Sequence, residues 1–178
     1  MKKSPKKAAT RQITKPSPAH RRDLAKLRLI VFDFDGVMTD NRVMVMQDGT
    51  EGVLCNRSDG LGIGMLRDAG LALLILSKEE NPVVSARARK LKIECMQGID
   101  DKLTALKALL AHRAIDAASV AYVGNDLNDL ECMGHVGMPI AVADAYPQVL
   151  RIAQLTTTRP GGHGAVREVC DWILSARQ

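Results

Sequence analysis

The sequence predicts an α/β protein built on a mainly parallel β-sheet with helices on both faces. Short apolar runs typical of buried strands alternate with amphipathic stretches from residue 27 onward. The first run, "LRLIVFDF", ends in two aspartates, Asp33 and Asp35, and polar residues follow several later runs in the same way. Strands that alternate with helices form βαβ units, and the strands of such units are parallel.

One domain is expected at residues 27–178, after a disordered basic tail at residues 1–26. Residues 1–28 hold ten Lys or Arg and one Asp, so the formal net charge of +5 comes from the tail, and the rest is mildly acidic. The tail has no aromatic residue and few large aliphatic ones, a composition that forms no core. We expect a solvated extension without a nucleic-acid partner; a nucleic-acid-binding arm is the alternative.

The cysteines and the hydropathy exclude several classes of protein. The four cysteines include no C-x-x-C pair, which argues against a zinc site or a disulfide framework and suits a reducing compartment. No run of about 18 apolar residues occurs, so no membrane span is expected. The N-terminus lacks the apolar segment of a signal peptide, and the expected location is the cytoplasm.

The first expected elements are a buried strand and a hairpin. The apolar run at 27–34 is the strand. Two β-prone segments, 42–46 and 50–56, flank the turn-forming pair Asp48-Gly49, a pattern typical of a β-hairpin.

Helices and strands then alternate to the end of the chain. Residues 58–70 predict a helix with Asp59 near its start and Gly70 as its C-cap, and the apolar run 71–76 predicts a second strand. A helix with proline in its first turn follows at 81–93. The remaining expected elements are strands at 94–97, 119–124 and 138–143 and helices at 102–112, 129–134, 145–153 and 165–176.

Polar residues from four segments are expected to meet at one edge of the sheet. In open parallel sheets the ligand crevice lies outside the carboxyl ends of the strands. The residues that follow the strands, or begin the helix after one, are Asp33, Asp35, Ser77, Lys78, Glu79, Lys102, Asn125, Asp126 and Asp129. This convergence indicates an enzyme.

The residue types at this edge point to a metal-assisted phosphate chemistry. Carboxylates without His or Cys ligands suit a hard cation, Mg²⁺ above all. The expected ligands are Asp33 and Asp35, with Asn125, Asp126 or Asp129 completing the set.

Each remaining residue then has an expected role. Asp33 is placed to attack phosphorus and form an aspartyl-phosphate, and Asp35 to act as general acid and base. Ser77 and Lys102 are placed to hold the phosphoryl oxygens.

These residues resemble the four motifs of the haloacid dehalogenase superfamily. The motifs are "DFDGVMTD", Ser77 after a strand, Lys102 in "DDK", and "GNDLND", in that order, within residues 28–177. The resemblance implies a Rossmann-like three-layer α/β/α fold with a β-hairpin flap. The segments between the motifs are short, so no cap domain is expected.

Within the superfamily, the chain resembles the capless sugar-acid phosphatases of sialic acid or lipopolysaccharide biosynthesis. These act on 3-deoxy-octulosonate 8-phosphate or on nonulosonate 9-phosphates, and the chain is most similar to the phosphatase-like domain of CMP-sialic acid synthetases. The resemblance implies a homotetramer in which a neighbouring subunit contributes to each site. The substrate-binding candidates are Glu79, Arg87, Lys90, Arg57, Lys78, Arg159 and Arg167.

Two of these assignments have alternatives. Arg87 and Lys90 lie at i and i+3 of the expected helix, where they suit a sugar-acid carboxylate or form a solvated basic face. The segment "RPGGHG" (159–164) resembles a loop that closes over a neighbour's site, and a plain turn before the last helix is the alternative.

Two positions depart from the family pattern. Asn125 stands where active members usually carry a metal-binding Asp, and Lys78 stands where sugar-acid phosphatases often carry a small residue. The leading hypothesis is a Mg²⁺-dependent nonulosonate 9-phosphate phosphatase. The alternatives are a 3-deoxy-octulosonate 8-phosphate phosphatase and a low-activity regulatory partner of a CMP-sugar-acid synthetase.

Overall fold

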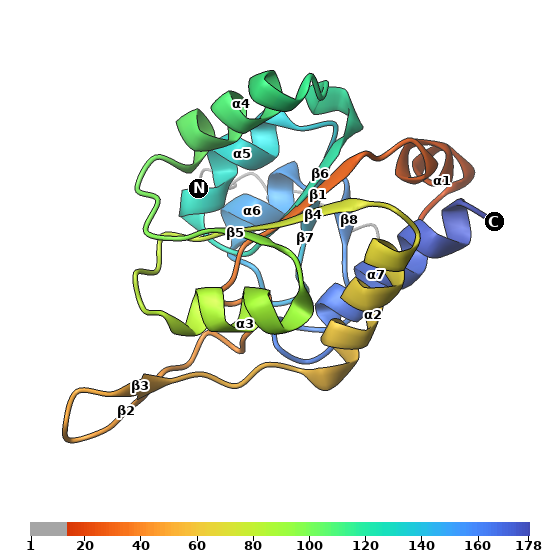
Figure 1. Cartoon of the computed structure of the whole chain (residues 1–178). Coiled ribbons are helices and arrows are strands. Elements are labelled where there is room, and N and C mark those ends of the chain that lie inside the picture. Colours follow the sequence, from red (N-terminus) through yellow and green to blue (C-terminus); the bar gives the residue numbers. More distant parts are fainter. Residues whose placement is uncertain (1–13) are drawn as a thin grey trace, which may run out of the picture.

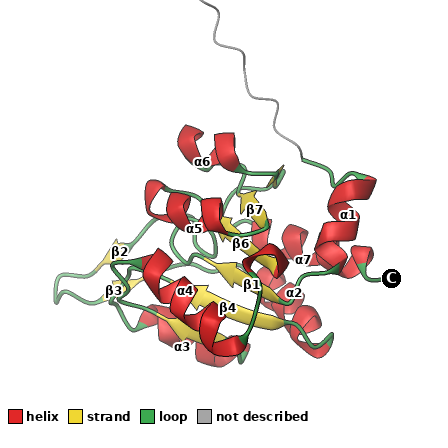
Figure 2. Ribbon diagram, turned by 90° about the horizontal axis from the view of Figure 1, so that it is seen from above, coloured by secondary structure: helices red, strands yellow, loops and turns green. Residues whose placement is uncertain are grey.

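The computed structural model describes residues 14–178, and a parallel sheet forms its centre (Figures 1 and 2). The strands follow the order β5-β4-β1-β6-β7-β8, and every pair is parallel. Helices cover both faces, which confirms the predicted three-layer α/β/α fold. The strands are β1 (Leu29–Phe32), β4 (Ala72–Leu76), β5 (Glu94–Met96), β6 (Val120–Gly124), β7 (Met138–Ala141) and β8 (Leu155–Thr156).

The central strand β1 creates the point at which the chain changes direction across the sheet. Its four residues are wholly buried, and Leu29 lies opposite Ala72 of β4 and Val120 of β6. From β1 the chain builds outward to β5 and then returns to β6 on the other side. Such a switch point leaves a crevice at the carboxyl ends of the strands.

The helices form one layer on each face of the sheet (Figure 1). Helices α4, α5 and α6 cover one face, and α1, α2, α3 and α7 cover the other. Within residues 14–178, no helix is both long and apolar enough to cross a membrane. The helices are α1 (Pro18–Ala25), α2 (Arg57–Asp68), α3 (Val83–Leu91), α4 (Lys102–Arg113), α5 (Leu130–His135), α6 (Pro147–Ile152) and α7 (Ala165–Ala176), with short 3₁₀ turns at Ala117–Ser119 and Leu127–Asp129.

The helix α7 shows how the sequence pattern produces the packing. Val166, Val169, Cys170 and Ile173 recur at helical spacing and are all buried. This apolar stripe packs against α2 and α1. The observed bounds agree with the predicted helix at 165–176.

The predicted hairpin is present and projects from the body of the domain (Figure 1). Strands β2 (Met44–Val45) and β3 (Glu51–Gly52) pair antiparallel. Gly49 takes a φ of 83° in the turn, a conformation that favours glycine, and the Asp48 carboxylate accepts a hydrogen bond from the Thr50 amide at 2.9 Å. The hairpin is therefore a local structure that its own turn residues specify.

The disordered-tail prediction is wrong for residues 18–25, which form α1. The Ser17 side chain caps this helix, and Pro18 occupies its first position. Leu24 is fully buried, and α1 packs against α7. One anchoring leucine in a polar segment gives no periodic pattern, so the composition of this segment predicted disorder where a helix forms. Residues 1–13 of the predicted tail lie outside the described residues.

Two smaller details also differ from the predictions. The strand β8 was not predicted, because two residues are too few to show a period; it forms by pairing with β7. The predicted C-cap of α2 was Gly70, whereas Ala69 is the C-cap and Gly70 follows it with a φ of 79°.

The glycine-rich turn before α7 packs directly against the loop after β1. A Cβ atom at Gly161 would lie 1.8 Å from the backbone oxygen of Gly36, and the Gly162 amide donates to the Val37 oxygen at 3.0 Å. Only glycine permits this approach. Within the chain, this segment is therefore a turn that supports the loop after β1.

Replacing Gly161 with alanine is expected to destabilise the protein. The added methyl group forces two backbone segments apart, and overpacking of this kind costs about 1–3 kcal/mol. Urea denaturation measures the loss. The control is Gly134→Ala on α5, where a Cβ meets nothing within 4 Å, so stability is expected to hold or rise. Equal stabilities of Gly161→Ala and wild type would contradict the prediction.

Candidate active site

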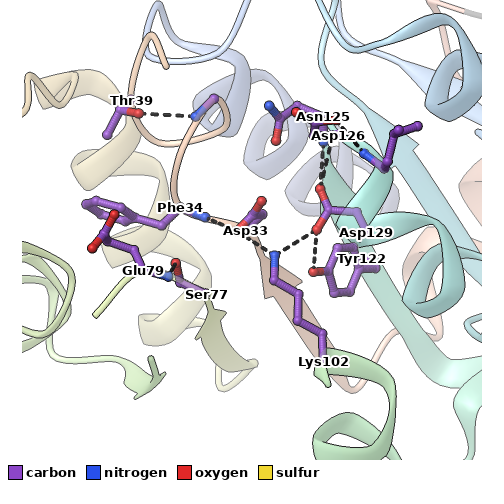
Figure 3. A network of polar contacts seen from close by, with 12 residues as sticks. Asp33, Phe34, Thr39, Ser77, Glu79, Lys102, Tyr122, Asn125, Asp126 and Asp129 are labelled. Atoms are coloured by element: carbon purple, nitrogen blue, oxygen red, sulfur yellow. Dashed lines mark hydrogen bonds and ion pairs between the residues drawn. The ribbon is translucent and has the colours of Figure 1, made fainter. Parts of the chain in front are cut away.

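A polar pocket of 660 Å³ opens at the carboxyl ends of the strands, where the sequence predicts a site. It brings together residues from the loops after β1, β4 and β6 (Figure 3). Its lining residues are Asp33, Asp35, Asn41, Ser77, Lys78, Glu79, Glu80, Asn125, Asp126, Leu127 and Asn128. Four carboxylate residues besides Asp33 line this pocket, so it is strongly acidic.

Asp33 sits at the end of β1 with its carboxylate fixed. Its amide extends the ladder by donating to the Val123 oxygen at 3.0 Å. Its Oδ1 accepts from the Phe34 amide at 2.7 Å and pairs with Lys102 Nζ at 2.8 Å. Both bonds use one oxygen, and among the described residues no hydrogen bond reaches Oδ2.

Lys102 is held by two buried carboxylates (Figure 3). It is the first residue of α4 and is 3% exposed, and its Nζ contacts Asp129 Oδ1 at 2.9 Å in addition to Asp33. Tyr122 of β6 donates its hydroxyl to the same Asp129 oxygen at 2.8 Å. Three elements far apart in the sequence thus meet in one network.

Asp129 serves this network and does not line the pocket. Its Oδ1 accepts from Lys102 and Tyr122, and its Oδ2 accepts from the amides of Asn125 at 2.9 Å and Asp126 at 3.3 Å. Both oxygens are taken by the protein. This geometry favours a positioning role for Asp129 over the metal-ligand role expected from the sequence.

The network sets the proton affinities of its members. Burial raises the pKa of Asp33 to about 8; Asp129 adds to this effect and Lys102 opposes it. Burial alone lowers the pKa of Lys102, yet Asp33 and Asp129 together raise it above its ordinary value. Lys102 therefore stays cationic.

Asp35 is the second aspartate of the first motif and lines the pocket. Burial raises its pKa above the ordinary range, and Glu79 adds to this, whereas Lys102 and a hydrogen bond with Thr39 act in the opposite direction. A carboxyl group with a raised pKa is suited to acid–base catalysis.

Asn125 carries an unsatisfied buried oxygen beside the two aspartates. Its Oδ1 is buried without a hydrogen-bond partner, and the residue lines the same pocket as Asp33 and Asp35. A buried acceptor left without a donor is costly, so this oxygen fits a cation ligand. Across residues 14–178, no three His, Cys, Asp or Glu side chains cluster as metal ligands, and the candidate donors for a cation here are two carboxylates and one amide.

Asp126 also lines the pocket, but its carboxylate is partly engaged. Its Oδ1 accepts from the Leu127 amide at 2.6 Å and caps the following 3₁₀ turn. Asp126 lies near the candidate cation site, and no hydrogen bond from another described side chain holds its carboxylate.

The loop after β4 presents the remaining predicted residues. Ser77 is buried, and its Oγ accepts from the Glu79 amide at 3.1 Å. Lys78 lines the pocket and pairs with exposed Asp100 at 3.3 Å. The predicted Ser77, Lys78 and Glu79 therefore lie together beside Asp33 and Asp35.

The other substrate-binding candidates lie elsewhere. Arg57, Arg87 and Lys90 line a second groove of 530 Å³, which shares no lining residue with the acidic pocket. Arg167 pairs with Asp171 at 2.8 Å on α7, and Arg159 is exposed in the turn before that helix. Within one chain, these arginines and this lysine do not line the acidic pocket.

Sequence reasoning missed the residues that hold the site in place. Tyr122 lies within an apolar strand, where nothing in the pattern distinguishes a hydrogen-bonding tyrosine from a core residue. Thr39 accepts from the amides of Gly36 at 3.1 Å and Asn41 at 3.2 Å and so closes the catalytic loop. The threonine of "DFDGVMTD" was a visible signal for this role.

Metal-free stability is expected to fall as the pH rises from about 4 to about 8. Asp33 is then protonated in the folded state and ionised in the unfolded state, so unfolding releases a proton. The Asp33→Asn variant has no proton to release at this position. Its free energy of unfolding, relative to that of wild type, is therefore expected to increase steadily with pH. Urea denaturation in EDTA across this pH range measures how the free energy of unfolding of wild type and of Asp33→Asn changes with pH. The exposed exchange Asp68→Asn is the control, and identical slopes for Asp33→Asn and wild type would contradict the assignment.

Comparison with known proteins places this geometry in a family. The family model described as haloacid dehalogenase-like hydrolase matches residues 75–168. The chain is 41% identical over 154 residues to the 3-deoxy-D-manno-octulosonate 8-phosphate phosphatase KdsC of Yersinia pestis, covering 86% of this chain and 82% of that protein. It is 39% identical over 152 residues to KdsC of Escherichia coli K12, covering 85% and 81%.

Solved structures agree. The phosphatase from Moraxella catarrhalis, solved with magnesium ion, phosphate ion and KDO, is 36% identical with a TM-score of 0.86 and coverage of 88% and 91%. A HAD family hydrolase from Streptomyces avermitilis is 53% identical with a TM-score of 0.82 and coverage of 84% and 86%. These matches confirm the resemblance and the enzyme class predicted from the motifs. The chain belongs to the haloacid dehalogenase-like hydrolase family.

Proposed function

We propose that this protein is a Mg²⁺-dependent phosphatase that acts on a 3-deoxy-2-keto sugar-acid phosphate, with 3-deoxy-octulosonate 8-phosphate as the first candidate. The observation that carries the proposal is the fixed carboxylate of Asp33 at the end of β1, paired with Lys102 at 2.8 Å beside an open pocket. The relatives named as 3-deoxy-D-manno-octulosonate 8-phosphate phosphatases support the substrate class.

In this mechanism Asp33 is the nucleophile. Its Oδ1 is occupied by the Phe34 amide and Lys102, which leaves Oδ2 to attack phosphorus and form an aspartyl-phosphate. Lys102 keeps its positive charge and offsets the negative charge that develops on the phosphoryl oxygens.

Asp35 is the general acid and then the general base. Its raised pKa allows it to hold a proton for the leaving oxygen of the sugar. After the sugar acid leaves, the same carboxylate takes a proton from the water that attacks the aspartyl-phosphate. Phosphate and free Asp33 result, so each cycle consumes one water molecule.

Ser77 and Lys78 are assigned to the phosphoryl and sugar groups. The Ser77 hydroxyl can donate to a phosphoryl oxygen while its own oxygen accepts from the Glu79 backbone amide. Lys78 is the cationic side chain that lines the acidic pocket, and its salt bridge with exposed Asp100 is weak enough to exchange for a ligand. Glu79 is suited to accept hydrogen bonds from sugar hydroxyls.

Asp33, Asp35 and Asn125 would hold Mg²⁺, with Asp126 close by. The unsatisfied oxygen of Asn125 supports this assignment. The cation supplies positive charge that neutralises the phosphate and the two aspartates. Asp129 contributes indirectly, because it holds Lys102 and the backbone of Asn125.

The comparisons change the order of the substrate hypotheses. The sequence favoured a nine-carbon nonulosonate 9-phosphate, whereas the curated relatives are named for the eight-carbon 3-deoxy-D-manno-octulosonate 8-phosphate. We therefore place the eight-carbon substrate first. Retention of Asp33, Asp35 and Ser77 in one pocket, with Lys102 paired to Asp33, favours turnover over a purely regulatory role.

A homotetramer is part of the proposal because the hairpin exposes apolar side chains. Val43, Met44, Val45 and Met46 are each at least 49% exposed. Such an apolar surface is typical of an interface. In a tetramer, the groove formed by Arg57, Arg87 and Lys90 of one subunit is the candidate that supplies positive charge to a neighbour's acidic pocket.

Phosphate release from a panel of sugar-acid phosphates tests the function. Wild type with Mg²⁺ is expected to hydrolyse 3-deoxy-octulosonate 8-phosphate faster than nonulosonate 9-phosphates, and EDTA is expected to abolish release. Asp33→Asn removes the nucleophile and is expected to lower kcat by about 10⁴-fold or more. Asp116→Asn, a capping exchange far from the pocket, is the control. No release from any substrate by folded protein at saturating Mg²⁺ would favour the regulatory alternative.

Light scattering after size-exclusion chromatography tests the assembly. Wild type is expected to elute with the mass of four 19.3 kDa chains. The double variant Met44→Glu/Val45→Glu places charge on the hairpin and is expected to give smaller species. Ile152→Glu changes an exposed apolar residue of α6 and is the matched control. A tetrameric double variant would show that the hairpin does not hold the assembly together.

A further inference from the structure

Asn125 is the neutral member of an otherwise anionic donor set. The pocket offers a cation the carboxylates of Asp33 and Asp35 and the buried, unpartnered Oδ1 of Asn125. No three acidic, His or Cys side chains cluster as metal ligands within the described residues, and the unpartnered oxygen of Asn125 is the candidate for the third ligand position.

The position of this amide is fixed by the backbone around it. The Asn125 amide N–H donates to Asp129, and its backbone oxygen accepts from the Tyr146 amide at 2.8 Å. Gly36 faces the side chain with a φ of 77°, and a Cβ there would lie 2.0 Å from Asn125 Nδ2. An aspartate, which has the same shape, can take the same place, so the choice of amide is a matter of charge.

The charges around the pocket show what the amide changes. A bound divalent cation keeps Asp33 ionised, and Asp35 is ionised whenever it does not hold the proton for the leaving oxygen, while Lys102 and Asp129 balance each other behind them. At most two negative ligands then offset the charge of one divalent cation. A phosphate group that enters must also pass the other carboxylates that line the pocket, which are Glu79, Glu80 and Asp126.

We propose that the neutral Asn125 lowers the affinity for free Mg²⁺ and raises the affinity for phosphate. The metal is then bound tightly only together with a phosphate group. A third carboxylate at this position would attract the cation more strongly and repel the phosphate. The neutral oxygen still fills a coordination position. By linkage, phosphate raises Mg²⁺ affinity by the factor by which Mg²⁺ raises phosphate affinity. This inference rests on the proposed function, because it takes Mg²⁺ and phosphate as the ligands.

The test is a set of binding measurements on the full chain. Isothermal titration calorimetry and thermal-unfolding titrations give the Kd of Mg²⁺ with and without inorganic phosphate, and the Kd of inorganic phosphate with and without Mg²⁺, at constant ionic strength. In wild type, phosphate is expected to tighten Mg²⁺ binding about tenfold or more. In Asn125→Asp, Mg²⁺ alone is expected to bind about tenfold tighter, and phosphate at saturating Mg²⁺ about tenfold weaker.

Two further variants separate ligation from general charge. Asn125→Ala removes the oxygen and is expected to bind Mg²⁺ more weakly than wild type. Asn128→Asp adds the same charge at an exposed position of the same pocket, and both affinities are expected to stay within about threefold of wild type.

The outcomes distinguish this inference from the proposed function. The inference is supported if Asn125→Asp binds Mg²⁺ more tightly and phosphate more weakly than wild type, while Asn128→Asp shows neither change. If wild type hydrolyses sugar-acid phosphates but Asn125→Asp changes neither affinity, or raises both, the inference alone is overturned. An Asn125→Ala variant that binds Mg²⁺ like wild type also overturns it. If wild type binds neither ligand in any combination and releases no phosphate, the proposed function fails as well.

Discussion

The buried ion network of Asp33, Lys102 and Asp129 is the interaction on which the rest of the site depends. It joins the end of β1, the first turn of α4 and the loop after β6, which are separate in the sequence. Two carboxylates and one ammonium are costly to bury, and they are tolerated because hydrogen bonds satisfy them, including that of Tyr122. Removing Lys102 would leave the buried Asp129 carboxylate without its cation, so catalysis and folding share these residues.

Close backbone packing fixes the loops that surround this network. Gly36 leaves room for the side chain of Asn125, and Gly161 lies against the backbone of Gly36. Gly124 allows the Asp129 side chain to approach, since a Cβ there would lie 2.7 Å from Asp129 Cβ. The loops therefore stack on one another through positions without side chains. This packing places charged groups with little freedom to move, which is the preorganisation that catalysis on a charged phosphate requires.

The charge of the pocket connects the fold to the proposed chemistry. An acidic pocket repels a phosphate ester unless cations are present, and one chain supplies the buried Lys102 and the pocket-lining Lys78. A divalent metal and basic groups from a neighbouring subunit would supply the remainder. In the proposed mechanism, the neutral amide of Asn125 would limit the negative charge at the point where the metal and the phosphate meet. In this proposal, metal binding, substrate binding and assembly all serve to offset the negative charge of the pocket and the phosphate.

The sequence by itself determined the fold class, most element boundaries and the group Asp33, Asp35, Ser77, Lys78 and Asn125. Periodicity and turn residues are local, and parallel strands necessarily bring their carboxyl ends to one edge. Only the tertiary structure decided that Asp129 faces Lys102 and Tyr122 and not the pocket, and that Leu24 anchors α1. It also separated the groove of Arg87 and Lys90 from the acidic pocket. The physical reason is that side-chain direction, burial and hydrogen-bond partners depend on contacts between distant segments, which no local pattern contains.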